Sequence, residues 1–297
     1  MRLPNYLTEA DIRELCRRAI EEDVGSGDAT TLAIVPEGLA TEAHFVTRQE
    51  CVVCGLPVIA VLFQMLNPAV TLTALVAEGT LVRPGMRLAT VSGDARTILT
   101  GERTALNLLQ RLCGIATVTR RYVDALGPDC KTKLLDTRKT TPGLRRFEKY
   151  AVLTGGAQNH RIGLYDRIMI KDNHREMAKL VGGPHSIGKA VAACRAKYPA
   201  LEIEVEADSL EDVREAADAN VEYILLDNMS NELMAEAIQI IGGRAKTEAS
   251  GNITLERLPS MRNLGLDYIS SGALTHSAKA IDIGLDIIGG ERLIRNA

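Results

Sequence analysis

The sequence has no tryptophan and only three phenylalanines in 297 residues. Proteins that bind single-stranded nucleic acids usually stack bases on aromatic side chains, and this chain offers few of them. Its net charge is −3 and its isoelectric point is near 6, so basic residues are not in excess to contact a phosphate backbone. The composition therefore argues against a nucleic-acid partner.

Long hydrophobic runs are also absent. The longest candidate, residues 52–66, is interrupted by Gly55, Pro57 and Gln64, whereas a transmembrane helix needs about 20 apolar residues. The first residues, MRLPNYLTEADIRE, have no apolar core of the kind found in signal peptides. We therefore expect a soluble, cytoplasmic protein without a membrane partner.

Clustered cysteines and glycine-rich nucleotide loops are missing as well. The six cysteines are scattered, and the close pair Cys51 and Cys54 has no second pair or nearby histidine to complete a zinc site. We expect free, buried thiols. Neither GxxxxGK followed by serine or threonine nor GxGxxG occurs, which argues against a nucleoside triphosphate or a dinucleotide as ligand.

The charges that are present are unevenly distributed. Residues 131–175 contain 11 Lys and Arg against 4 Asp and Glu, a local charge of +7, and the rest of the chain therefore carries −10. Such a local excess suits a small, highly charged anion better than a long polyanion, which needs a broad basic face. A solvated charged surface is the alternative interpretation.

The first third of the chain mixes helix and strand patterns. Apolar residues at helical spacing follow Thr8, a plausible cap, and predict a helix over residues 7–23. The runs EAHFVTRQECVVCG, VTLTALVAEGTLV and MRLATVSGD resemble strands separated by turns. From Thr100 onward, apolar residues recur every three or four positions and predict a long helix.

Short apolar strands, each ending in polar residues, recur after this helix. They are KLLDTRK, DRIMIKDNH, EIEVEAD, YILLDNMS, AKTEASGN and YISSGALT. Helical patterns fill intervening segments such as 186–197 and 210–219. Six such units predict a parallel sheet, either closed into a barrel or doubly wound. In both architectures the polar residues at the C-terminal ends of the strands form the site.

The strand ends differ in chemistry. The first two supply Arg138, Lys139 and Lys171, and nearby loops add Arg145, Arg146, His160, Arg161 and His174. Guanidinium groups can hold carboxylates bidentately. The next two ends supply Glu204, Glu206 and Asp227. These carboxylates either neutralise the cations as ion pairs or hold a divalent ion that bridges phosphate oxygens, and spacing alone does not choose between the two.

The last two strand ends contain glycine. EASGN and SSGAL both lead into helices, a setting in which barrels bind phosphate on backbone N–H groups. Ordinary turn chemistry is the alternative. Taken together, the six ends predict a cup for a small polyanion, such as a phosphorylated sugar or a polyacid.

Several motifs, in this order, resemble the quinolinate phosphoribosyltransferase family. They are GERTALN, DTRKTTPGLR, NHRIGLYD, IKDNH, EVE, LLDN, EASGN and SSGALTH, and EDVGSGDATT near the N-terminus extends the likeness over nearly the whole chain. Two positions depart from the family pattern: Cys113 stands where serine is expected, and Asn252 stands where many members have glycine.

The resemblance implies an α/β fold with two domains. Residues 1–114 would form an N-terminal open α/β sandwich domain, on which a C-terminal helix of residues 276–297 packs. Residues 115–275 would form an incomplete six-stranded parallel α/β barrel. The resemblance also implies a homodimer or a higher oligomer with shared active sites, in which Arg103 reaches the partner's quinolinate.

The activity implied by the resemblance is transfer of the phosphoribosyl group of phosphoribosyl pyrophosphate to quinolinate with decarboxylation. The products are nicotinate mononucleotide, pyrophosphate and carbon dioxide, in de novo NAD biosynthesis. Mg²⁺ is implied, bound by Glu206 and Asp227, and no organic cofactor is needed. The implied catalytic residues are Lys139, Lys171, Glu206 and Asp227, and the two lysines are candidates for reprotonating the ring. The implied substrate-binding residues are Arg103, Thr137, Arg138, Lys139, His160, Arg161 and Lys171, with Ser250, Gly251, Asn252, Ser271, Gly272 and Ala273 for the 5′-phosphate.

Three other functions are compatible with parts of the pattern. Lys139 or Lys171 at a strand end suits a Schiff-base aldolase. An inactive relative that only senses a phosphorylated ligand has the same motifs. A relative that acts on another pyridine carboxylate, such as nicotinate, differs from the first interpretation only in its product.

Overall fold

The computed structural model describes residues 3–288, which divide into two compact units. The first unit combines the chain up to Arg120 with Arg146–Gly156 and the segment from Ala278 onward. The second comprises Arg121–Arg145 and Ala157–Ser277. Helix α4 (Ala95–Leu126) belongs partly to each unit, so the predicted division between residues 114 and 115 falls inside a helix. No described helix has both the length and the apolar character needed to cross a membrane.

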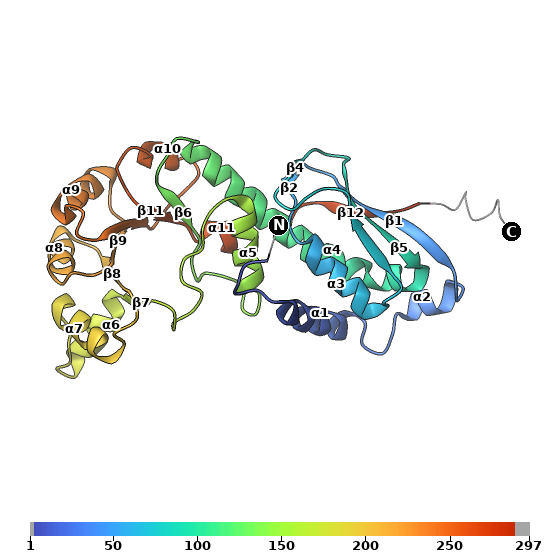
Figure 1. The fold of residues 1–297 in the computed structure, drawn as a ribbon, viewed down its shortest axis with the longest axis horizontal. Coiled ribbons are helices and arrows are strands. Elements are labelled where there is room, and N and C mark those ends of the chain that lie inside the picture. Colours follow the sequence, from blue (N-terminus) through green and yellow to red (C-terminus); the bar gives the residue numbers. More distant parts are fainter. Residues whose placement is uncertain (1–2, 289–297) are drawn as a thin grey trace. The chain divides into compact units, whose positions relative to one another are not determined.

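The first unit is built on an antiparallel sheet with the strand order β12-β1-β5-β3 (Figure 1). Its strands are β1 (Ala40–Thr47), β3 (Thr71–Ala74), β5 (Arg87–Asp94) and β12 (Ile283–Ile288), and a short pair is formed by β2 (Cys51–Val52) and β4 (Leu81–Val82). Its other helices are α1 (Glu9–Asp23), α2 (Ala29–Ile34), α3 (Leu56–Leu66) and α5 (Arg145–Gly155). The predicted N-terminal helix is confirmed. It starts at Thr8, whose hydroxyl and backbone N–H form a capping box with Asp11.

The C-terminal segment forms a strand and not the predicted helix. A helix over residues 276–297 is wrong for the described part, because residues Ile283–Ile288 form strand β12 and pair antiparallel with β1. In the run IDIGLD, apolar residues alternate with aspartate or glycine, a period of two that suits a strand, and glycine and β-branched residues disfavour a helix. Residues 289–297 lie outside the described residues.

The second unit contains the six-stranded parallel sheet, with the order β6-β11-β10-β9-β8-β7. Its strands are β6 (Lys133–Leu135), β7 (Ile168–Ile170), β8 (Ile203–Ala207), β9 (Tyr223–Asp227), β10 (Lys246–Ser250) and β11 (Tyr268–Ser270). Its helices are α6 (Asp172–Leu180), α7 (Ile187–Lys197), α8 (Leu210–Asp218), α9 (Asn231–Ile241), α10 (Leu258–Met261) and α11 (Ala273–His276). Figure 1 shows α8 and α9 along one side of β8 and β9.

The strand order makes this sheet an incomplete barrel. Each strand from β7 to β11 pairs with the next, and the last strand pairs with the first, β6, but no β6–β7 pairing occurs among the described residues. Leu135 at the end of β6 instead makes an isolated parallel bridge with Gln158. The predicted α/β fold with an open barrel of six parallel strands is thereby confirmed.

Alternation along the strands determines which side chains share a face. Glu204 and Glu206 lie on one face of β8, and Ile203, Val205 and Ala207 lie on the other. Strand register then places Glu206 beside Leu225 of β9 and Leu225 beside Glu248 of β10. The carboxylates of β8 and β10, which lie on either side of β9, are therefore on the same face of the sheet.

Candidate active site

A cavity of about 480 Å³ lies at the C-terminal ends of the parallel strands in the second unit. Its lining includes both charged residues from the loops and inward-facing residues of the strands. The lining residues are Thr137, Arg138, Lys139, His160, Arg161, Met169, Lys171, Glu206, Leu225, Asp227, Asn228, Glu248, Ser250, Gly251, Asn252 and Ser270. Most of the residues expected at the site from the sequence are thus brought together around one cavity.

Four of the substrate-binding residues implied by the family resemblance do not line this cavity, and neither do Arg145, Arg146, His174 and Glu204 of the strand ends and loops. Ser271 and Gly272 directly follow its lining residue Ser270, and a side chain at Gly272 would come within 2.9 Å of the Lys139 side chain. Ala273 begins helix α11. Arg103 is exposed on the part of α4 that belongs to the other unit.

Two arginines present unfilled hydrogen-bond donors at the cavity. Within the described residues, Nη1 of Arg138 and Nε of Arg161 are buried and have no hydrogen-bond partner. Burial lowers the pKa of the Arg161 guanidinium, and the nearby charge of Arg138 lowers it further. A buried donor without an acceptor and a repelling pair of cations are both unfavourable, and an anion between them would relieve both.

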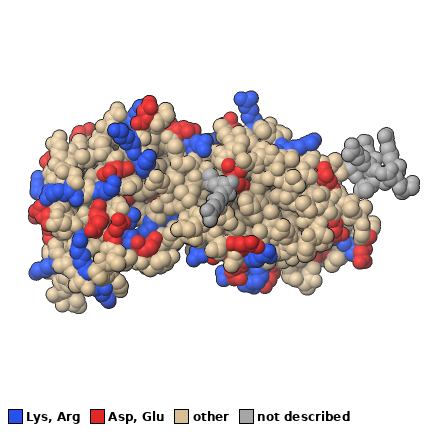
Figure 2. All heavy atoms as spheres, in the orientation of Figure 1, with Lys and Arg blue, Asp and Glu red and all other residues tan. Residues whose placement is uncertain are grey.

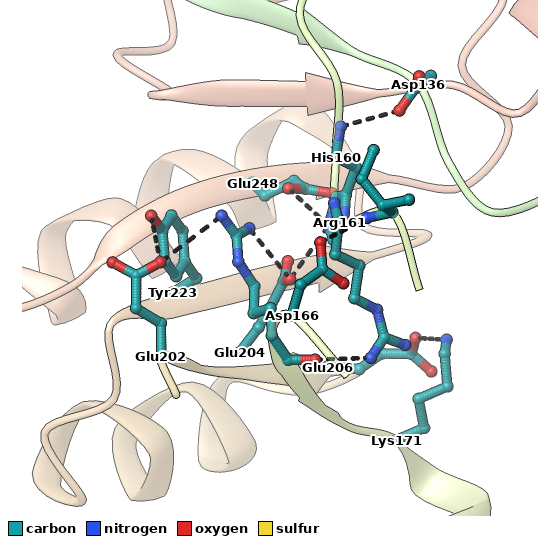
Figure 3. A network of polar contacts seen from close by, with 12 residues as sticks. Asp136, His160, Arg161, Asp166, Lys171, Glu202, Glu204, Glu206, Tyr223 and Glu248 are labelled. Atoms are coloured by element: carbon teal, nitrogen blue, oxygen red, sulfur yellow. Dashed lines mark hydrogen bonds and ion pairs between the residues drawn. The ribbon is translucent and has the colours of Figure 1, made fainter. Parts of the chain in front are cut away.

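The local structure fixes the position of Arg161. Its Nη1 donates to the backbone oxygen of Arg167 at 2.9 Å, which anchors one side of the guanidinium. The loop between them is held by Asp166, whose carboxylate accepts from the backbone N–H groups of Ile162 at 2.7 Å and Gly163 at 2.8 Å. Arg161 therefore projects from a loop whose conformation is fixed by hydrogen bonds (Figure 3).

Carboxylates line another part of the cavity. Lys171 pairs with Glu206, which lies on β8, and Asp227 follows on β9. Burial raises the pKa of Glu206; Lys171 opposes this, while the charges of Asp227 and Asp172 raise the pKa further. In this part of the cavity, the carboxylates of Glu206 and Asp227 thus carry more charge than the ammonium group of Lys171 offsets. Carboxylate oxygens are the ligands that Mg²⁺ prefers.

The turns that follow β9 and β10 are in close contact and are joined by a hydrogen bond. Gly251 has a φ of +88° and approaches Asn228 so closely that a Cβ would lie 2.2 Å from its Oδ1, so only glycine fits. Asn252 has a φ of +50° and donates through Nδ2 to Asn228 Oδ1 at 3.1 Å. Asparagine tolerates this left-handed conformation better than most other residues with a side chain, so it can occupy a position where the family resemblance leads us to expect glycine. Successive turns of this kind can direct backbone N–H groups toward an anion.

Asp136 and Glu248 shape the site although neither is among the site residues predicted from the sequence. Asp136, of the DTRK motif, is fully buried and accepts from the backbone N–H of His160 at 2.8 Å, so it positions the histidine loop. Glu248 lines the cavity although it is fully buried, and Glu204 lies beneath it beside His160 (Figure 3). For Glu248, the available signal was a carboxylate in the middle of a predicted barrel strand, because such residues are rarely buried without a partner.

A cavity at this edge of an α/β barrel, with cations and carboxylates converging on it, defines an enzyme-type site for a small, multiply charged substrate. Two family models match the chain: quinolinate phosphoribosyl transferase, N-terminal domain, over residues 28–113, and the C-terminal domain over residues 115–286. The chain therefore belongs to the quinolinate phosphoribosyltransferase family.

Individual relatives agree with this assignment. The chloroplastic nicotinate-nucleotide pyrophosphorylase [carboxylating] of rice, Oryza sativa subsp. japonica, is 40% identical over 93% of this chain and 78% of its own length. A mitochondrial quinolinate phosphoribosyltransferase [decarboxylating] of Nicotiana tabacum is 40% identical over 93% of this chain and 82% of its own. The solved structure of NadC from Streptococcus pyogenes has a TM-score of 0.88 and 42% identity, covering 95% of this chain and 99% of that one.

Proposed function

We propose that this protein transfers the phosphoribosyl group of phosphoribosyl pyrophosphate to quinolinate with decarboxylation, giving nicotinate mononucleotide, pyrophosphate and carbon dioxide. The reaction is a step of de novo NAD biosynthesis. The observation that carries the proposal is the pair of arginines, Arg138 and Arg161, each with a buried and unfilled donor at one cavity. Quinolinate has two adjacent carboxylates, which suit two guanidinium groups approaching from different loops.

Binding by several cations orients the substrate. The cations that line the cavity come from three separate segments, with Arg138 and Lys139 on one, Arg161 on the second and Lys171 on the third. The two carboxylates of quinolinate are therefore held from more than one direction. The ring nitrogen is then fixed toward the anomeric carbon of the ribose. Holding two reactants in this way can contribute about 7 kcal/mol or more to lowering the barrier.

Glu206 and Asp227 would hold Mg²⁺, and their carboxylates fit it because the local negative charge exceeds that of Lys171. When bound, the ion supplies positive charge that stabilises the departing pyrophosphate. The 5′-phosphate would be held by backbone N–H groups in the segment Ser250, Gly251 and Asn252 and by those of Gly272 and Ala273. The N–H of the adjacent Ser271 donates to the backbone oxygen of Leu135 at 3.0 Å.

Decarboxylation requires no organic cofactor. Once the ring nitrogen carries the ribose it is positively charged, and it stabilises the electron pair left on the adjacent carbon when carbon dioxide departs. The cations of the cavity must hold the departing carboxylate only moderately, because tight ground-state binding would slow its loss.

The distribution of charge on the surface favours a small anion as ligand over a nucleic acid or another long polyanion. Figure 2 shows Lys and Arg interspersed with Asp and Glu over the visible face, so that face has no broad region of positive charge. For the aldolase alternative, a nucleophilic lysine must be uncharged, whereas Lys171 faces the Glu206 carboxylate. A cytoplasmic location is part of the proposal and awaits cell fractionation.

The function is tested by measuring carbon dioxide released from quinolinate labelled in the carboxylate next to the ring nitrogen. Release is expected only when phosphoribosyl pyrophosphate and Mg²⁺ are both present, and the product should have the mass of nicotinate mononucleotide. Omitting either component is the control. Turnover of nicotinate with no release from quinolinate would instead identify a relative with another substrate, and no turnover of either would indicate a sensor.

We also propose a homodimer, or a higher oligomer, with shared sites. Arg103 is exposed and has no position in the cavity of its own chain, which is compatible with a role in a partner's site. Mixing Arg103→Ala chains with Lys171→Ala chains should restore about a quarter of wild-type activity, because about half of the dimers are mixed and each has one intact site. Each variant alone should be nearly inactive. The absence of recovery on mixing would contradict a shared site.

A further inference from the structure

A buried cluster that the proposed mechanism does not use lies beneath the cavity. Glu204 and Glu248 come from strands β8 and β10, and both are fully buried. Nε2 of His160 lies 3.0 Å from Oε2 of Glu204 and 3.5 Å from Oε2 of Glu248 (Figure 3). Of the two carboxylates, only Glu248 also lines the cavity.

The hydrogen bonds of His160 identify its tautomer. Its Nδ1 accepts from the backbone N–H of Arg161 at 2.7 Å, so this nitrogen has no proton. The ring proton is therefore on Nε2, which faces the two carboxylates, and the imidazole is neutral. Both ring nitrogens of His160 therefore face protein atoms, so His160 supports the cluster. Its side chain also lines the cavity, and the role in substrate binding implied by the family resemblance stays a prediction.

The charges around the cluster do not balance if both carboxylates are ionised. The nearest cation is Arg167, whose Nη1 lies 3.6 Å from Glu204 Oε2. The remaining groups facing Glu248 are the neutral His160 and the hydroxyl of Ser270. The charge of Arg161 also acts on Glu204, so Glu204 has two guanidinium groups near it, whereas Arg167 is the cation that acts on Glu248. An uncompensated charge on Glu248 in this interior would cost several kcal/mol, so one carboxylate keeps a proton.

The environment selects Glu248 as the protonated member. Burial raises its pKa well above the ordinary value, and the charge of Glu204 raises it further, whereas the nearby Ser270 hydroxyl and the charge of Arg167 act in the opposite direction. Glu204 is closer to the two donors, His160 and Arg167. Glu248 is therefore a carboxylic acid that reaches the cavity floor.

We propose that Glu248 is the catalytic acid that returns a proton to the ring carbon after carbon dioxide has left. This inference rests on the proposed function. The bond between the ring carbon and its carboxylate breaks and leaves its electron pair on the carbon. The O–H bond of Glu248 then breaks, the proton bonds to that carbon, and the O–H electrons remain on the carboxylate. Solvent restores the proton before the next turnover, and the adjacent Glu204 makes Glu248 ready to accept it.

The main test is Glu248→Gln, which keeps the shape and neutrality of the side chain but cannot donate as an acid. Loss of a positioned acid should lower kcat about 100-fold. In a single turnover followed by rapid quench, pyrophosphate should still form at the wild-type rate while nicotinate mononucleotide appears slowly, and quinolinate affinity should be unchanged. Glu202→Gln is the matched control, because Glu202 directly precedes β8, the strand that carries Glu204, and its side chain is 55% exposed.

Three results would overturn the inference while wild-type turnover of quinolinate upholds the function. The first is an unchanged kcat in Glu248→Gln. The second is an equal slowing of pyrophosphate and nucleotide formation together with weaker quinolinate binding, which would indicate a structural role. The third is a stoichiometric metal ion in the purified wild-type protein that is lost in Glu248→Gln. A wild-type protein that releases no carbon dioxide from quinolinate would instead refute the function itself.

A second variant tests the same idea even if Glu248→Gln does not fold. Glu248 acts in its protonated form, so its contribution to kcat is present below its pKa and is lost as pH rises through it. Glu204→Gln removes a charge that raises this pKa. The loss of kcat at high pH should therefore occur at lower pH in Glu204→Gln than in the wild type. An unshifted profile would contradict the proposal.

Discussion

Replacing both carboxylates of the cavity, Glu206→Ala together with Asp227→Ala, should lower kcat by more than about 1,000-fold, because metal stabilisation of a leaving group is worth several kcal/mol. Both residues line the cavity, and both contribute to the local excess of negative charge. Without them, Glu248 is the one carboxylate left among the described residues that line the cavity. Quinolinate binding should change little, since Lys171 loses its partner but keeps its charge.

The measurement combines steady-state kinetics with titration of Mn²⁺, used as a spectroscopic substitute for Mg²⁺. The double variant should show neither Mg²⁺-dependent turnover nor a specific Mn²⁺ site. Glu211→Ala with Glu236→Ala is the matched control, since it removes two exposed carboxylates from α8 and α9 of the same unit. Wild-type turnover in the double variant would remove the metal assignment.

Arg161→Ala should lower kcat/KM for quinolinate by about 1,000-fold, since two charge-assisted hydrogen bonds to a buried carboxylate are worth about 1.5–3 kcal/mol each. The side chain is 8% exposed and its Nε has no partner among the described residues. Its removal leaves a substrate carboxylate in the cavity facing fewer donors. The loss should appear mainly in quinolinate KM and much less in the KM for phosphoribosyl pyrophosphate.

Two further variants make this result specific. Arg161→Lys restores the charge but not the paired donors of a guanidinium, so it should recover only part of the affinity. Arg195→Ala removes an arginine whose side chain is 43% exposed and should leave the kinetics unchanged. If Arg161→Ala keeps wild-type kinetics while it folds normally, the quinolinate site lies elsewhere.

Much of the site could be predicted from the sequence because of one topological rule. In a parallel sheet, the ends of successive strands meet at one edge, so polar residues that follow apolar strands converge without any need to know the details of packing. Arg138, Lys171 and Asp227 were placed in this way, and the cavity contains all three. The order of motifs was also enough to suggest the family.

Other features depended on contacts between distant segments. The C-terminal strand β12 forms because β1, far earlier in the chain, offers a free edge, and the sequence alone gave no reason to prefer that partner over helical packing. The cluster of Glu204, Glu248 and His160 likewise depends on the register of β8, β9 and β10. A shift of one residue would turn these carboxylates to the opposite face.

The sequence by itself determined the fold class, the family and the types of charged group at the strand ends, because alternation, spacing and motif order are local properties of the chain. Only the tertiary structure decided which charges are paired, which are buried and which remain unfilled. Solvation and the distances between ionic groups govern protonation and binding, and both are set by strands and loops that are remote in sequence. For this reason the donors of Arg138 and Arg161 and the acid at Glu248 became apparent only in the folded barrel.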